Sequence, residues 1–261
     1  MKTPGALLEA MRETAPLVQN ITNFVSMNVM ANVLLAAGAS PAMVHAREEA
    51  AEFAALASAL TINIGTLSPP WVDAMKAAAK TASDAGKPWV LDPVAVGATS
   101  YRRQTGAELL ALRPGIVRGN ASEILALAAE GGAGKGVDSG DTVQTAEAAA
   151  RAIAGETGGV VAVTGPEDFV TDGARVARVD NGHALMPKVT ALGCALTGVV
   201  AAFASTAEDP FEATVAALAF YGLAGEKAAA RAEGPGSFAV AFLDALATVD
   251  GATLDAGARI A

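Results

Sequence analysis

The chain has 261 residues, of which 52% are hydrophobic, enough for one large α/β domain or two small ones with a sizeable core. Its formal net charge is −9, and an acidic chain repels phosphate backbones and anionic lipid. Neither nucleic acid nor a membrane is therefore an expected partner. One cysteine, Cys194, and two histidines, His45 and His183, exclude an internal disulfide, a cysteine-built zinc site and a histidine cluster.

The N-terminal segment is amphipathic, with charges at Glu9, Arg12 and Glu13, and lacks the apolar core of a secretory signal. The most apolar stretch, 193–204, is shorter than the roughly 20 residues that span a bilayer. We therefore expect a cytoplasmic protein.

Up to Thr164, short apolar strands alternate with longer helical segments. The predicted strands are residues 16–21, 41–45, 60–65, 88–92, 116–118 and 159–164. The predicted helices are residues 25–37, 48–57, 70–85, 106–111 and 122–129. This order predicts an α/β fold with a mainly parallel sheet and helices on both faces.

The pattern changes after Thr164. Residues 169–179 read as a β-hairpin with Asp172-Gly173 at its turn. Helices are then predicted over 194–205, 210–232 and 237–247. The glycine-rich stretch 131–140 is a loop too short for a convincing linker between domains. We therefore expect a single domain, residues 1–261.

The loop Gly131-Gly132-Ala133-Gly134-Lys135-Gly136 resembles a phosphate-binding loop, but Gly136 stands where a Walker A motif needs Ser or Thr. It also follows a helix rather than a strand, so an ordinary surface loop is the favoured interpretation. The first strand is not followed by a Gly-x-Gly-x-x-Gly motif, which disfavours a dinucleotide-binding dehydrogenase.

Asp92 closes a predicted strand, and acidic residues at the carboxyl ends of parallel strands face the crevice where ligands bind. Such a carboxylate can orient a metal-bound water or lie near a transferring phosphate. An equally good interpretation is a turn aspartate that caps backbone amides.

Asn120 and Glu123 follow the next strand and open a helix three residues apart, which suits hydrated magnesium because this ion takes few direct protein ligands. Arg118 beside them can clamp a nucleotide phosphate. The alternative is a capping box, with Asn120 as the N-cap and Glu123 at the third helical position.

Two further turns carry candidate residues. Thr164-Gly165 either touches phosphates or forms an ordinary strand-to-hairpin turn. The segment from Ala191 through Gly193 to Cys194 precedes an apolar helix, whose free backbone amides attract anions. Cys194 in the first turn has either a lowered pKa or a packing role in the core.

Taken in order, six sequence blocks resemble the hydroxyethylthiazole kinase family of ribokinase-like enzymes. The blocks are Asn20-Ile21-Thr22-Asn23, Gly38 to Val44 with Met43, Asn63-Ile64-Gly65-Thr66, Leu91 to Ala98 with Asp92, Arg118 to Glu123, and Glu233 to Phe238. The resemblance extends from about Pro16 to about Leu243.

This resemblance implies a ribokinase-like three-layer αβα fold. It also implies ATP- and magnesium-dependent phosphorylation of the primary alcohol of 4-methyl-5-(2-hydroxyethyl)thiazole, for thiamine salvage. The family further implies a homotrimer with active sites between subunits. Carried over by position, the implied roles are nucleotide binding for Arg118 and Thr164, magnesium binding for Asp92, Glu123 and Asn120, thiazole binding for Asn23, Met43 and Ala191, and catalysis for Gly193 and Cys194.

Two positions of this loop distinguish the chain within the superfamily. Most ribokinase-like enzymes have Asp where Cys194 stands, and cysteine is typical of the thiazole branch. That branch usually has Gly-Thr where this chain has Ala191-Leu192. The alternatives are a sister kinase for a pyrimidine or pyridoxal-type alcohol, a repair dehydratase on the same scaffold, and an inactive metabolite-binding homologue.

Overall fold

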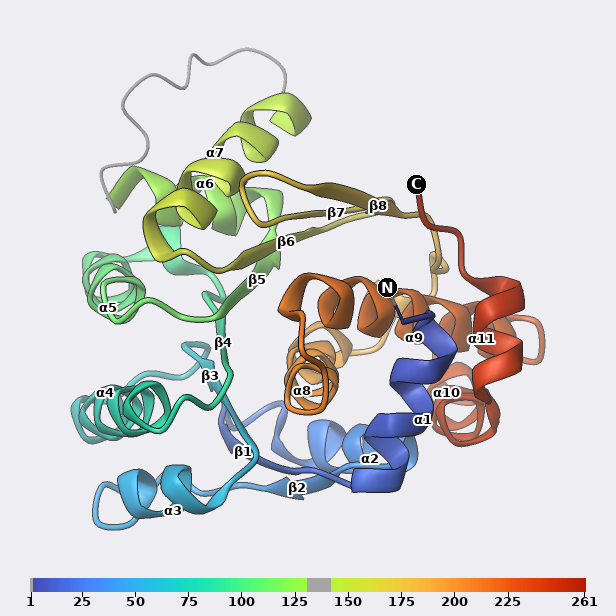
Figure 1. Cartoon of the computed structure of the whole chain (residues 1–261), viewed down its shortest axis with the longest axis horizontal. Coiled ribbons are helices and arrows are strands. Elements are labelled where there is room, and N and C mark those ends of the chain that lie inside the picture. Colours follow the sequence, from blue (N-terminus) through green and yellow to red (C-terminus); the bar gives the residue numbers. More distant parts are fainter. Residues whose placement is uncertain (1, 131–141) are drawn as a thin grey trace.

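A computed structural model describes residues 2–130 and 142–261, and one eight-stranded sheet runs through them (Figure 1). The strand order is β2-β1-β3-β4-β5-β6-β7-β8. The strands are β1 (Leu17–Ile21), β2 (Ser40–Ala42), β3 (Ala59–Asn63), β4 (Trp89–Asp92), β5 (Ile116–Asn120), β6 (Val160–Thr164), β7 (Asp168–Thr171) and β8 (Val176–Val179). Strands β1 to β6 pair in parallel, and β7 and β8 extend the sheet antiparallel. The mainly parallel sheet is thus confirmed.

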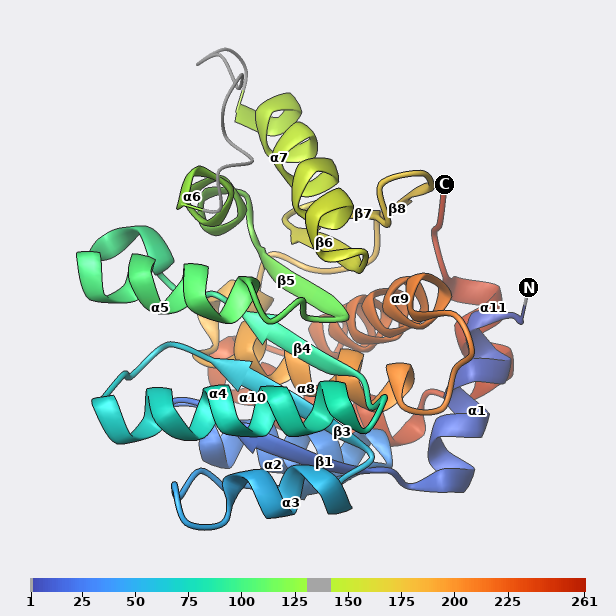
Figure 2. The ribbon, with the colours of Figure 1, turned by 60° about the vertical axis from the view of Figure 1, so that its left-hand side comes forward.

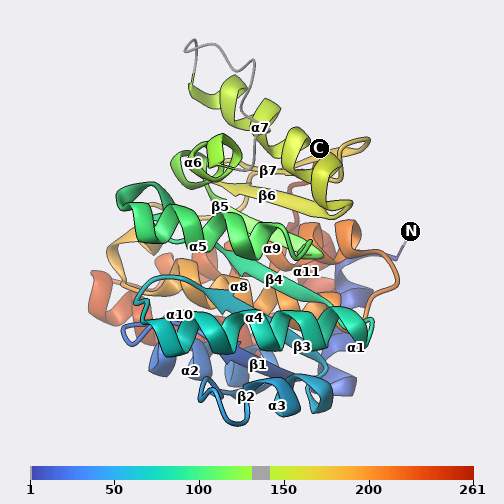
Figure 3. The same cartoon turned by 90° about the vertical axis from the view of Figure 1, so that its left-hand side faces the viewer.

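Helices cover both faces of this sheet, as Figures 1 and 3 show. One side carries α1 (Pro4–Thr14), α2 (Met27–Ala37), α8 (Leu192–Ala204), α9 (Pro210–Ala229), α10 (Pro235–Thr248) and α11 (Gly251–Gly257). The other carries α3 (Ala50–Leu56), α4 (Pro69–Asp84), α5 (Ser100–Leu110), α6 (Ala121–Glu130) and α7 (Thr142–Thr157). The short 3-10 helices are η1 (Val96–Ala98) and η2 (Met186–Lys188). The predicted three-layer αβα arrangement is confirmed.

The central strands are apolar on both faces because each face is covered by helices. Val90 and Ile116 belong to the hydrophobic core on the α8 side, whereas Leu91 and Val117 belong to the core on the α4 side. Successive side chains of a strand point to opposite faces, so continuous apolar runs fill two cores at once.

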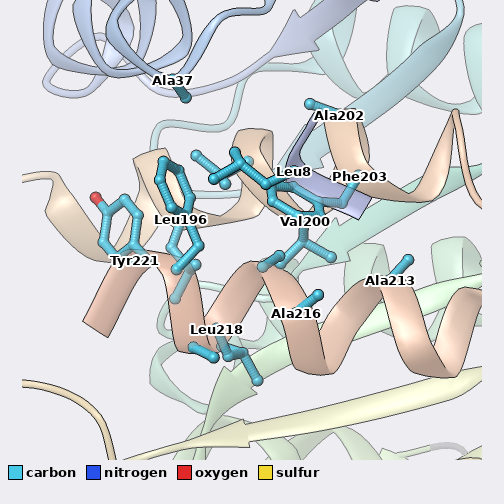
Figure 4. Close-up of a cluster of buried hydrophobic side chains, with 14 of the residues drawn as sticks. Leu8, Ala37, Leu196, Val200, Ala202, Phe203, Ala213, Ala216, Leu218 and Tyr221 are labelled. Carbon is cyan, nitrogen blue, oxygen red and sulfur yellow. The ribbon is translucent and has the colours of Figure 1, made fainter. Parts of the chain in front are cut away.

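Helix α8 is buried over almost its whole length. Its side chains Leu196, Val200 and Phe203 pack against side chains of α9 and against Leu8 of α1 (Figure 4). A helix that is apolar all round belongs in a core. Such packing holds α8 in one place, and therefore fixes the position of its N-terminus.

Several element boundaries differ from the predictions. Strand β2 ends at Ala42 rather than at 45, and α5 begins at Ser100 rather than at 106 because the Thr99 hydroxyl accepts a hydrogen bond from the backbone N–H of Arg102. Helices α1, α7 and α11 were not predicted as such. The hairpin is confirmed, with Gly173 at φ +93°. The segment Gly131–Gly136 lies outside the described residues.

Within the part of the chain that the structure describes, no single helix has the length and apolar composition to cross a membrane, although α10 and α11, bent by 111°, meet those two criteria as a pair.

We predict that Gly222→Ala destabilises the protein by about 1–3 kcal/mol, because overpacking a tight contact costs this much. A Cβ at Gly222 of α9 would lie 2.4 Å from the carbonyl oxygen of Asn181. Gly155→Ala is the matched control, since Gly155 is also helical and nothing lies within 4 Å of an added Cβ. This control should gain about 0.5–1 kcal/mol. Urea unfolding of both variants measures the difference, and equal stabilities would contradict the prediction.

Candidate active site

The predicted site residues gather at the carboxyl ends of the parallel strands. Asp92 ends β4, Thr164 ends β6, and Arg118 and Asn120 lie in β5. Asn23 follows β1 closely. The strand order reverses between β1 and β3, and ligands of open α/β sheets bind at such a switch point. Helix α8 packs across β1, β3 and β4 from one side, as Figure 2 shows.

Asp92 is fully buried at the centre of the site. Its Oδ2 accepts hydrogen bonds from Asn63 Nδ2 at 2.7 Å and Thr197 Oγ1 at 3.0 Å, and Arg118 Nη1 lies 3.9 Å away. Its Oδ1 is buried without a hydrogen-bond partner among the described residues. Burial raises the pKa of Asp92 to about 6; Arg118 lowers this pKa and Glu123 raises it. One carboxylate oxygen is therefore left for a cation or a water.

Cys194 is connected to Asp92 through two buried asparagines. Asn23 Nδ2 lies 3.4 Å from Cys194 Sγ and 2.9 Å from Asn63 Oδ1, while Asn63 donates to Asp92. Asn23 packs closely against the backbone of Gly65, and only glycine leaves room for it, since a Cβ on Gly65 would lie 2.8 Å from Asn23. Of the two alternatives considered for Cys194, the lowered pKa is wrong, because burial and the charge of Asp92 raise the pKa of the thiol.

Arg118 ties two strands to α8. Its Nη1 donates to the carbonyl oxygen of Gly193 at 3.0 Å, and its Nη2 donates to Thr164 Oγ1 at 2.7 Å. Only 11% of its side chain is exposed. The structure thus brings together the two residues predicted to contact a nucleotide and the start of the predicted catalytic loop.

Asn120 and Glu123 form the capping box that was the alternative to a metal site. Asn120 Oδ1 accepts from the backbone N–H of Glu123 at 3.0 Å, and Glu123 Oε2 accepts from the backbone N–H of Asn120 at 2.9 Å. Glu123 Oε1 also accepts from the backbone N–H of Ala95 at 3.1 Å. Glu123 thus links the segments that follow β4 and β5, and its charge acts on Asp92.

The first turn of α8 presents free backbone amides. The first backbone hydrogen bond of the helix runs from Ala195 N to Ala191 O, so the N–H groups of residues 192–194 have no partner within the helix. Ala191, the N-cap, is left-handed with φ +67°. The hydroxyl of Tyr221, on α9, donates to the carbonyl oxygen of Leu192 at 2.7 Å and so holds this turn in place. Such a terminus suits an anion.

A cavity of about 720 Å³ opens beside this turn. Arg118, Thr164, Ala191 and Gly193 line it, together with the loop 181–190 and Tyr221. Asp168 also lines it and accepts a hydrogen bond from the backbone N–H of Gly165 at 2.9 Å. Burial raises the pKa of Asp168 to about 6. The cavity therefore joins the anion-binding turn to the arginine and threonine predicted to hold a nucleotide.

Four polar residues of the site carry no predicted role: Asn63, Asp168, Thr197 and Tyr221. Asn63 stands in a block that resembles the kinase family, which is the one sequence signal that singled it out. Met43 follows β2 and packs against the hydrophobic core on the α8 side. A metal site built from three or more His, Cys, Asp or Glu side chains is not found among residues 2–130 and 142–261.

Comparisons with known proteins point to one enzyme family. The model of the hydroxyethylthiazole kinase family matches residues 8–251. The chain is 68% identical to a hydroxyethylthiazole kinase of Cereibacter sphaeroides, over 98% of this chain and 97% of that protein. It is 67% identical to one of Rhizobium johnstonii, over 99% and 97% of the two chains.

Solved structures give the same picture. A hydroxyethylthiazole kinase of Pyrococcus horikoshii superposes with a TM-score of 0.92 at 41% identity, covering 99% of this chain and 98% of that one. A pyridoxal kinase of Staphylococcus aureus in complex with AMP-PCP superposes with a TM-score of 0.61 at 18% identity, covering 81% and 88%, and shares the fold.

We predict that Ala191→Gly stabilises the protein by about 1 kcal/mol. The left-handed conformation costs a residue with a Cβ about 1–2 kcal/mol, and glycine avoids this cost. Part of the gain is lost because glycine loses more conformational entropy on folding. Ala195→Gly, one turn further along α8, is the control and should lose about 1 kcal/mol or more. Urea unfolding measures both. A loss of stability in Ala191→Gly would show that the cap conformation is not strained.

Proposed function

Because the chain belongs to the hydroxyethylthiazole kinase family, it phosphorylates the alcohol of hydroxyethylthiazole with ATP, and we propose that Asp92, Glu123 and Cys194 carry this reaction with magnesium. The observation that carries the proposal is the connected buried network from Cys194 through Asn23 and Asn63 to Asp92. This network connects the thiol that we propose faces the alcohol to the carboxylate that we propose meets metal and phosphate.

The residues present fit magnesium. Asp92 has a buried carboxylate oxygen with no hydrogen-bond partner among the described residues, and Glu123 adds a second charge beside it. Asn120 lies at the same edge, where its Oδ1 already accepts from the Glu123 N–H and the Ser122 hydroxyl, so it supports the site by holding Glu123 in place. Two carboxylates suit an ion that keeps most of its waters and binds through substrate phosphates. Bound there, magnesium neutralises charge on the phosphate oxygens.

Arg118 and Thr164 bind the nucleotide in this proposal. Arg118 is held by Thr164 and by the carbonyl oxygen of Gly193, so its charge stays at the boundary between the cavity and the start of α8. A fixed guanidinium binds phosphate oxygens without the cost of ordering a free side chain. The cavity volume accommodates a nucleotide.

The thiazole alcohol binds at the β1/β3 switch point, against Asn23, Met43 and Ala191. Its hydroxyl faces Cys194, whose raised pKa keeps the thiol protonated near neutral pH. The thiol therefore orients the hydroxyl, and the proton of the alcohol passes to a phosphate oxygen or to water late, as the new O–P bond forms and the bond to ADP breaks. The free amides of residues 192–194, with Gly193 allowing close approach, stabilise charge on the transferring phosphoryl group, whose transition state is loose.

We further propose a cytoplasmic, single-domain subunit that assembles into a homotrimer with active sites between subunits. Phe24 and Val25 support this assembly, since they directly follow Asn23 and are 70% and 61% exposed. A partner subunit that covers them would close the rim of the thiazole site. The single continuous sheet supports one domain.

A magnesium–ATP coupled assay across thiazole, pyrimidine and pyridoxal-type alcohols tests the function. We expect the thiazole alcohol to give the highest kcat/KM and its phosphate as product. A preference for the pyrimidine alcohol would overturn the substrate assignment, and thiazole binding without ADP formation would indicate an inactive homologue. Light scattering after size-exclusion chromatography tests the trimer.

We predict that Asp92→Asn lowers kcat by about 100-fold or more and Glu123→Gln by about 10-fold or more, because each removes charge where metal and phosphate meet. Both variants should need more magnesium for half-maximal velocity. Glu130→Gln, at the exposed end of the same helix as Glu123, is the control and should behave as wild type. If Asp92→Asn and Glu123→Gln had wild-type turnover at limiting magnesium, the proposed metal-binding role would be wrong, and both carboxylates would only cap backbone amides.

Substitutions of Cys194 separate chemistry from packing. We predict that Cys194→Asp folds and keeps substantial kinase activity, because the free amides and dipole of α8 stabilise a carboxylate there and aspartate is a competent proton acceptor. Cys194→Ala should be slower, since nothing then orients the hydroxyl. Melting temperatures and steady-state kinetics decide between the two roles. An inactive aspartate variant beside a fully active alanine variant would assign Cys194 to packing.

A further inference from the structure

Arg102, on α5, binds three backbone carbonyls at the edge of the site. Its Nη1 donates to the carbonyl oxygens of Ile64 at 2.6 Å and Val94 at 3.0 Å, and its Nη2 donates to that of Gly65 at 2.6 Å. Arginine in a protein interior usually pairs with a carboxylate. Among the ion pairs of the described residues, none involves Arg102, and the partners of its guanidinium are backbone carbonyls.

These carbonyls belong to the segments that follow β3 and β4. All described peptide bonds are trans, so the N–H of each peptide group points opposite to its C=O. The peptide between Ile64 and Gly65 is held by Arg102 at its oxygen, and its N–H donates to Asn63 Oδ1 at 2.9 Å. One peptide group therefore joins Arg102 to Asn63.

A second peptide group repeats this arrangement. Arg102 holds the carbonyl oxygen of Val94, and the N–H of the same peptide, that of Ala95, donates to Glu123 Oε1 at 3.1 Å. Ala95 has φ +52°, a left-handed conformation that costs a residue with a Cβ about 1–2 kcal/mol. The hydrogen bonds on both sides of this peptide maintain that conformation.

Both branches end on the proposed magnesium ligands. Asn63 donates to Asp92 Oδ2 at 2.7 Å and accepts from Asn23, which contacts Cys194, while Ala95 donates directly to Glu123. We propose that Arg102 is a positioning residue of the kinase that, through these two peptide groups, holds Asp92 and Glu123 in the geometry that magnesium and ATP require. This inference rests on the proposed function.

The chemistry of the guanidinium explains why this position suits arginine. Its planar donors reach three carbonyls at fixed angles, whereas a lysine ammonium is a point charge on a flexible stem. A guanidinium charge next to a carbonyl oxygen also polarises the peptide group. This strengthens the hydrogen bond that the N–H of the same peptide donates. Arg102 therefore fixes both the direction and the strength of the bonds to Asn63 and Glu123.

The test compares Arg102→Lys and Arg102→Ala with Arg103→Ala. Arg103 is the next residue of α5, donates to a single carbonyl, that of Gly97, and pairs with Glu130 at the surface, so it is a matched control. Melting temperature, kcat, both KM values and the magnesium concentration for half-maximal velocity are measured. The labelling rate of the only cysteine, Cys194, by a thiol reagent without nucleotide or metal reports on the Asn23 branch.

Loss of an outer contact to a metal ligand typically costs about 10-fold or more in metal affinity or activity. We expect both Arg102 variants to show a loss of this size in kcat and in magnesium requirement. We also expect faster Cys194 labelling, and partial rescue of Arg102→Ala by added guanidinium. Arg103→Ala should leave all of these at wild-type values.

A folded Arg102→Lys variant with the magnesium dependence and Cys194 labelling rate of the wild type would overturn the proposal. Losses of kcat that are fully explained by the fraction of unfolded protein would also overturn it. If the wild-type protein lacked magnesium-dependent kinase activity, the proposed function would fail separately. The labelling rates would then still show whether Arg102 orders the network at Asn23.

Discussion

A fully buried carboxylate at the end of a central strand is the constraint around which the site is organised. Burial of the Asp92 charge is unfavourable unless hydrogen bonds and a nearby cation compensate for it. The compensating groups come from three different elements: Asn63 of β3, Thr197 of α8 and Arg118 of β5. Asn63 also accepts a hydrogen bond from Asn23, Arg118 also donates to Gly193 and Thr164, and Thr197 is buried in α8. The hydrogen bonds that compensate for the burial of the Asp92 charge therefore also join the sheet to α8.

Helix α8 connects this network to the anion-binding turn. Leu192 is buried, and Tyr221 holds its carbonyl oxygen, so the first turn is fixed by packing and by one hydrogen bond. This explains how the turn accepts Ala191 in a left-handed conformation that favours glycine. The anion site consists of backbone amides, and a side-chain change at 191 or 192 leaves those amides in place.

Pattern and spacing were enough to predict the layers of the fold, because doubly covered strands and alternating helices have strong signals. The Ala-rich α7 was missed because its sequence has few large apolar residues to mark a buried face. Asp92, Arg118 and Thr164 were located by their places at strand ends, whereas Asn23 and Met43 were located only by the resemblance to the kinase family. Of the two alternatives for Cys194, the lowered pKa was wrong, because burial and the charge of Asp92 raise the pKa of the thiol, and burial cannot be read from spacing. Asn63 meets Asp92 through strand register, which only the pairing of β3 with β4 reveals.

The contacts of Arg102 belong to a further class that sequence motifs do not reveal. Strand ends leave carbonyl groups without ladder partners, and a partly buried carbonyl needs a donor whatever side chain its residue carries. Ile64, Gly65 and Val94 supply such carbonyls where β3 and β4 end. One arginine satisfies all three, and the opposite ends of two of these peptides point to Asn63 and Glu123. The hydrogen-bonding needs of the backbone at the strand ends thereby determine where the functional side chains are held.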